Sequence, residues 1–108
     1  MSAPLTLDTA RGNDGKLVLT AAGEIDLSNI ETFERALTTA STEAAKSGGK
    51  LTVDLSAVEY LDSAAINALF THAEDIHLIV RPLLMPVFRI SGLTELTTIE
   101  TAPPTAEH

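Results

Sequence analysis

The sequence predicts an α/β fold: a small mixed β-sheet of four to five strands, with three to four helices mainly on one face. Three observations lead to this prediction. The chain begins with a hairpin pattern, it continues with strands that alternate with helices, and each helix has a single apolar stripe. Strands separated by helices pair in parallel through right-handed crossovers. A doubly wound sheet, with helices on both faces, is the competing architecture.

The hairpin is predicted from leucines that alternate with polar residues on both sides of a turn-rich segment. These leucines are Leu5, Leu7, Leu17 and Leu19. The segment between them, residues 11–15, reads Arg-Gly-Asn-Asp-Gly and is rich in turn formers. We expect the second strand of the hairpin to span about residues 16–22.

The first helix follows a capping-box pattern. In residues 28–31, Ser28 would accept a hydrogen bond from the third helical amide while Glu31 reaches back to the cap amide. The apolar residues that follow at helical spacing are Ile30, Phe33, Leu37, Ala40 and Ala44. Gly48 and Gly49 then predict the end of the helix.

The second half of the chain alternates strands and helices. Residues 51–55 predict a short strand, and a helix starts near Asp62 or Ser63. The apolar face of that helix comprises Ile66, Leu69, Phe70 and Ala73. The apolar run over residues 76–80 predicts a strand buried on both faces, with His77 as a core polar group.

A short helix and an edge strand complete the pattern. The helix contains Val87, Phe88 and Ile90 and ends at Gly92, and residues 97–101 predict the edge strand. We expect one domain over residues 1–101 and a flexible tail over residues 102–108.

Composition restricts the possible functions of the 108-residue chain. It has no cysteine, which excludes disulfides, thiolate metal sites and cysteine catalysis. Its formal net charge of −8 repels phosphate backbones and anionic membranes, so it disfavours nucleic-acid and membrane partners and suits a protein with a basic face. Residues 1–4 show no basic region and no apolar run, which indicates a soluble, cytoplasmic protein without a secretion signal.

The chemistry-bearing residues do not indicate an enzyme. His72, His77 and His108 lack the spacing of metal ligands, so we expect no metal and no cofactor. Residues 12–15 form a turn and not a phosphate-binding loop. Ser63 has no motif that places a base beside it, so no Ser-His-Asp arrangement and no catalytic residue is predicted.

Three motifs together resemble the STAS domain of bacterial anti-sigma-factor antagonists, from about Leu5 to Ile99. Residues 23–26, Gly-Glu-Ile-Asp, precede a helix as in the family's Gly-x-Leu-Asp motif. Residues 53–63 resemble the strand, loop and helix that carry the family's phosphorylated serine, and residues 91–93, Ser-Gly-Leu, resemble its closing motif. Two features depart from the pattern. Ala65 replaces a usual glycine, and the segment between Ser63 and Pro82 is shorter by roughly two helical turns.

The resemblance implies a regulatory role for Ser63. The serine would be phosphorylated by a histidine-kinase-like serine kinase that is also the anti-sigma factor. Phosphorylation would abolish binding and so regulate transcription, as in stress responses, through partner switching. The residues implied in partner binding are Asp26, Asp62, Ser63, Ala64, Ala65 and Asn67. From position alone, Ser63 would instead be a helix cap.

Other functions remain as alternatives. The chain could be a STAS scaffold that pairs with proteins and is never phosphorylated, a reading favoured by Ala65 and the short second helix. It could be a phospho-relay receiver in which Asp54 accepts phosphate, but Asp8 is isolated and no lysine follows Lys50. Nucleotide binding by the first helix and catalysis rank below these.

Overall fold

The computed structural model describes residues 4–12 and 14–102, and its elements follow the predicted order. The strands and α-helices are β1 (Thr6–Arg11), β2 (Leu17–Ile25), α1 (Ile30–Lys46), β3 (Leu51–Leu61), α2 (Ser63–Thr71), β4 (Ile76–Val80), α3 (Met85–Ser91) and β5 (Thr98–Thr101). Three short 3₁₀ helices, η1 (Ala73–Asp75), η2 (Pro82–Leu84) and η3 (Leu93–Glu95), connect the later elements. No helix in the described ranges is long and apolar enough to cross a membrane.

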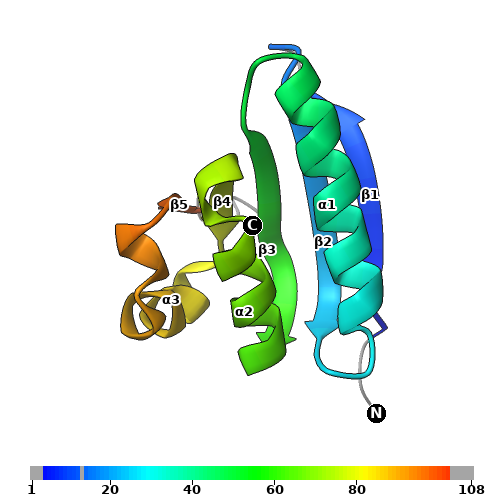
Figure 1. Ribbon diagram of the computed structural model, residues 1–108. Helices are drawn as coiled ribbons and strands as arrows, with labels where there is room; N and C mark the ends of the chain where they lie inside the picture. Colours follow the sequence, from blue (N-terminus) through cyan, green and yellow to red (C-terminus); the bar gives the residue numbers. More distant parts are fainter. Residues whose placement is uncertain (1–3, 13, 103–108) are drawn as a thin grey trace, which may run out of the picture.

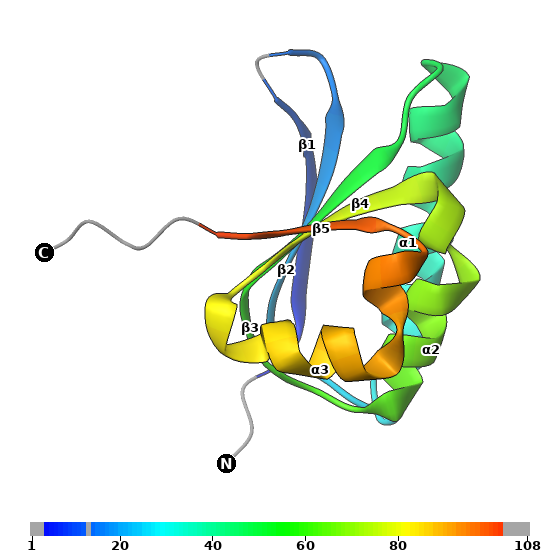
Figure 2. The same ribbon diagram turned by 90° about the vertical axis from the view of Figure 1, so that its left-hand side faces the viewer.

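The five strands form one mixed sheet in the order β1-β2-β3-β4-β5. Strand β1 is antiparallel to β2, and all other neighbours are parallel. Helices α1 and α2 lie side by side on one face of the sheet, and α3 continues this layer beyond α2 (Figures 1 and 2). The predicted fold class is therefore confirmed, and the doubly wound alternative is wrong.

The core lies between the sheet and this helical layer. On β2 the buried side chains alternate with more exposed ones, as the hairpin pattern predicts. Four of the five residues in the predicted stripe of α1 are buried, namely Phe33, Leu37, Ala40 and Ala44. Phe88 of α3 and Leu93 of η3 complete the core.

Strands β2 and β3 are longer than predicted. Strand β2 runs to Ile25 and β3 to Leu61, where the sequence indicated ends near residues 22 and 55. Two register shifts explain the difference on β3. The pairing passes from Thr20↔Asp54 to Ala22↔Ala57 and then from Gly23↔Val58 to Glu24↔Tyr60, so each shift inserts one extra residue on β3. These bulges interrupt the alternation of buried and exposed residues on β3, so its periodic signal stops before the strand does, whereas the alternation on β2 continues to Ile25.

The predicted capping box at α1 is wrong. Asn29 is the N-cap residue, and it makes no side-chain cap hydrogen bond. The Ser28 hydroxyl instead donates to Oδ1 of Asp26, a charged acceptor only two residues away. The Asn29 side chain bridges the loop by accepting from the Asp26 amide and donating to the Glu24 carbonyl oxygen.

Three further predictions on the second half need correction or fall outside the described part. Strand β4 has one buried face, because His77 and Ile79 are partly exposed, and His77 Nε2 lies 2.8 Å from Glu100 Oε2 on β5. In α3 only Phe88 is buried. The tail predicted over residues 102–108 lies outside the described residues except Ala102, whose amide donates to the Val80 carbonyl oxygen at 2.7 Å. Residues 1–3 and His108 also lie outside them.

Adjacent glycines after α1 allow a matched test of this helix end. Gly48 has φ of +80°, and a Cβ at either Gly48 or Gly49 would meet no atom within 4 Å. We expect Gly48→Ala to lower the free energy of unfolding by about 1 kcal/mol, because an L-residue is strained at positive φ. Gly49→Ala should be neutral or slightly stabilising. Urea unfolding measures both, and equal effects would contradict the assignment of Gly48 as the strained position.

Candidate functional site

Ser63 lies at the end of the molecule where β2 and β3 finish. Ile25 pairs with Leu61 in the last step of the β2–β3 ladder, and the Asp62 amide donates to the Ile25 carbonyl oxygen at 3.1 Å. The N-terminal ends of α1 and α2 lie at this same end (Figure 1). The loop after β2 and the start of α2 therefore form one continuous surface.

Asp62 joins the two parts of this surface. Its Oδ1 accepts from the amides of Ala64 at 3.0 Å and Ala65 at 3.2 Å, so Asp62 is the N-cap of α2. Its Oδ2 accepts from the Leu27 amide at 3.0 Å, which ties the loop after β2 to the helix. One carboxylate thus satisfies three backbone donors.

Ser63 is the first residue of α2, and its side chain is exposed. Because Asp62 caps the helix, the alternative in which Ser63 is only the helix cap is wrong. The Ser63 hydroxyl has no hydrogen-bond partner among the described residues. Another molecule could therefore contact this hydroxyl without breaking a hydrogen bond of the described residues.

The remaining residues proposed from the sequence are placed differently. Asp26 is partly buried beside Ser28 and belongs to the same loop as Leu27. On α2, Ala64 is partly buried and Asn67 is exposed, whereas Ala65 is 0% exposed. The methyl group that distinguishes Ala65 from the family's glycine therefore packs into the core. Ala65 is therefore not accessible to a partner.

A groove beside Ser63 was missed by the sequence reasoning. It has a volume of about 390 Å³ and lies between α2 and α3. Its lining includes Leu61, Ser63, Ile66, Asn67, Val87 and Ile90. The sequence predicts only that Val87 and Ile90 belong to a short helix, and in the structure they are 41% and 88% exposed. Their spacing of three residues, offset from Phe88, is the signal that could have indicated a second apolar stripe on α3.

Charge is unevenly distributed along the strands. Acidic residues gather where β2 and β3 end, namely Glu24, Asp26, Glu59 and Asp62. Four of the seven cationic residues lie in or next to the hairpin turn and the α1–β3 connection at the other end, namely Arg11, Lys16, Lys46 and Lys50. An added phosphate at Ser63 would thus join these carboxylates, with Arg81, whose Nη1 donates to the Val58 carbonyl oxygen, as a cation near the same end.

The receiver alternative does not fit the structure. Asp54 lies in the middle of β3, and its Oδ1 accepts from the amide and hydroxyl of Ser56 at 2.9 and 2.6 Å. It is not at the strand end that a phosphate acceptor with magnesium needs. Within the part of the chain that the structure describes, no group of three or more His, Asp or Glu residues could hold a metal ion.

Comparison with known proteins decides the family. A family model described as the MlaB, STAS domain matches residues 9–98. The chain belongs to the STAS domain family. The match covers most of the chain and includes the end of β3, Ser63 and α2, so the resemblance noted in the sequence motifs is confirmed. No curated protein sequence matches this STAS domain.

Solved structures support the same fold. The STAS domain is similar to an anti-sigma factor antagonist from Mycobacterium paratuberculosis, with 28% identity, a TM-score of 0.77, and coverage of 98% of this chain and 92% of that one. It also resembles the anti-sigma factor antagonist SpoIIAA in its unphosphorylated form, with 17% identity, a TM-score of 0.68, and coverage of 91% of this chain and 89% of that one. The phosphorylated form of SpoIIAA, from Bacillus, matches with 17% identity, a TM-score of 0.62, and coverage of 91% and 92%. At these lower identities the SpoIIAA likeness shows the fold alone.

Proposed function

We propose that this STAS domain is an anti-sigma-factor antagonist that is switched off by phosphorylation of Ser63. Unphosphorylated, it binds a kinase-type anti-sigma factor in the bacterial cytoplasm and thereby frees a sigma factor. It has no catalytic role of its own. The observation that carries the proposal is the exposed Ser63 hydroxyl, which Asp62 leaves unused by capping α2 in its place. The similarity to the antagonist from Mycobacterium paratuberculosis supports it.

The switch works through charge at a fixed position. A phosphate adds about −1.5 to −2 charges at neutral pH. The amides of Ala64 and Ala65 already donate hydrogen bonds to Asp62, so fewer amides of the first helical turn are free to bind the phosphate. The phosphate therefore projects from the acidic end of the molecule. It repels a partner whose surface accommodates a neutral hydroxyl, and the fold is not rebuilt.

The groove supplies the attractive part of the interaction. Ile66, Val87 and Ile90 line it next to Ser63, and Ile90 is largely exposed. An apolar side chain of the partner would remove these residues from water, which favours binding roughly in proportion to the area buried. A dianion on the rim of the groove must lose water when the same complex forms, which opposes binding.

Phosphorylation can be tested directly by intact mass. The chain is incubated with the candidate anti-sigma kinase and ATP, and we expect it to gain the mass of one phosphate. Ser63→Ala should gain none. Ser47→Ala is the matched control, because Ser47 is an exposed serine at the distant end of α1. Equal phosphate incorporation in Ser63→Ala and the unaltered chain would contradict the proposal.

A second candidate function is a STAS interaction scaffold that is not phosphorylated. Two observations favour it. The description of the matching family model names MlaB and not an antagonist. In addition, Leu27 and Ile90, which lie near Ser63, are 75% and 88% exposed. Such apolar side chains suit a lasting complex. A stable complex that ATP neither dissociates nor modifies would favour this second function.

A further inference from the structure

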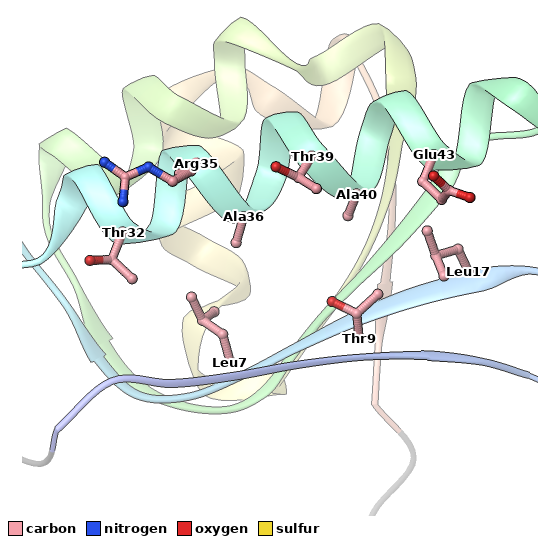
Figure 3. A pocket seen from close by; sticks show the side chains of 9 residues that line it. All are labelled: Leu7, Thr9, Leu17, Thr32, Arg35, Ala36, Thr39, Ala40 and Glu43. Atoms are coloured by element: carbon pink, nitrogen blue, oxygen red, sulfur yellow. The ribbon is translucent and has the colours of Figure 1, made fainter.

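A second cavity, of about 420 Å³, lies between α1 and the edge strand β1. It shares no lining residue with the groove at Ser63. Leu7 and Thr9 of β1 face Ala36 and Ala40 of α1 across the space (Figure 3). The proposed function makes no use of this cavity.

Small side chains on α1 create the cavity. Phe33 and Leu37 fill the core below the middle of the helix, but Ala36 and Ala40 face the edge strand with only a methyl group each. Leu17 and Ala40 are buried, whereas Leu7 and Ala36 are partly buried. The walls are therefore largely apolar and remain open to solvent, so an apolar occupant would remove them from water.

Two charged side chains of opposite sign, Arg35 and Glu43, line the cavity. Arg35 lines it from the exposed side of α1, and no carboxylate pairs with Arg35 in the described ranges. Glu43, about two turns further along the helix, lies 3.8 Å from Arg11 and 3.9 Å from Lys46. In a chain of net charge −8, the charge left unpaired here is thus positive.

We propose that this cavity binds an amphipathic carboxylate with a single acyl tail. The tail lies against Leu7, Leu17 and Ala36, and the carboxylate meets the guanidinium of Arg35, which can donate two parallel hydrogen bonds to it. The hydroxyl of Thr32, one turn before Ala36, also lines the cavity and can donate to the same head group. The volume is within the range of small-molecule sites.

The test uses three ten-carbon probes that differ in their head groups: decanoate, decanol and decyltrimethylammonium. Each is titrated into the full chain below the concentration at which it forms micelles, and amide shifts are followed by NMR. We expect saturable shifts confined to β1 and α1, with decanoate binding more tightly than decyltrimethylammonium. Ala36→Leu fills the space and should weaken decanoate about tenfold or more.

Matched variants separate the charge from the cavity. Arg35→Gln should weaken decanoate about threefold to tenfold and leave decanol unchanged, while Arg89→Gln on α3, with the same charge change, should alter neither. If Ala36→Leu does not fold, the comparison of Arg35→Gln with Arg89→Gln is sufficient to test the proposal. The proposal would be overturned if no probe gave saturable shifts. It would also be overturned if all three probes bound with equal affinity and Arg35→Gln and Arg89→Gln had equal effects on decanoate binding.

Discussion

Replacing Ser63 with glutamate is expected to weaken binding to the anti-sigma factor by about tenfold or more. The side chain is exposed at the rim of the α2–α3 groove, so a carboxylate there meets the partner directly. Like charges placed opposite one another, and a charge desolvated without a partner, each cost enough to produce such a loss. Ser63→Ala should bind within about twofold of the unaltered chain, because the hydroxyl has no structural hydrogen bond to lose.

Calorimetric titration of the purified pair measures these affinities. Ser47→Glu is the control, since it adds the same charge at an exposed position far from the groove. It should change the affinity little, because a distant surface charge is screened by salt. Indistinguishable affinities for Ser63→Glu and Ser63→Ala would show that charge at this position does not control the complex.

Replacing Asp62 with alanine is expected to lower the free energy of unfolding by about 2 kcal/mol. Loss of the α2 cap accounts for about 1 kcal/mol. Loss of the hydrogen bond from the Leu27 amide to Asp62 Oδ2 accounts for about 1 kcal/mol more, which is the usual net contribution of one hydrogen bond. Hydrogen exchange of the Leu27 amide should also become faster, since its acceptor is gone.

Two variants control this experiment. Asp62→Asn keeps one oxygen that can accept from the α2 amides, so it should cost about half as much. Asp75→Ala removes an exposed carboxylate in η1 and should stay within about 0.5 kcal/mol of the unaltered chain. Urea unfolding gives all three values. If Asp62→Ala and Asp75→Ala have the same stability, Asp62 is not the link between the two segments.

The order of the elements could be predicted because burial imposes periodicity. Phe33, Leu37 and Ala44 recur at helical spacing since one side of α1 faces the sheet. Leu17 and Leu19 alternate with exposed residues since one face of β2 meets that helix. These signals arise within one element, so they are present in the sequence before any tertiary contact is known.

Contacts between elements could not be predicted in this way. Ser28 matched a cap pattern, but α1 begins at Ile30, so Asn29 is the N-cap residue and Ser28 lies one residue before it. The bulges in β3 depend on its pairing with β2, and so does the position of Asp62 beside Leu27. The exposure of Ile90 depends on how α3 packs beside α2, which the apolar character of the residue does not reveal.

The most direct measurement compares the chain with and without a phosphate on Ser63, using authentic phosphoserine, which carries more charge than glutamate. Both forms are titrated against the same anti-sigma factor in the same buffer. The account predicts that the phosphorylated form binds at least about a hundredfold more weakly while its circular dichroism spectrum is unchanged. Equal affinity of the two forms would contradict it.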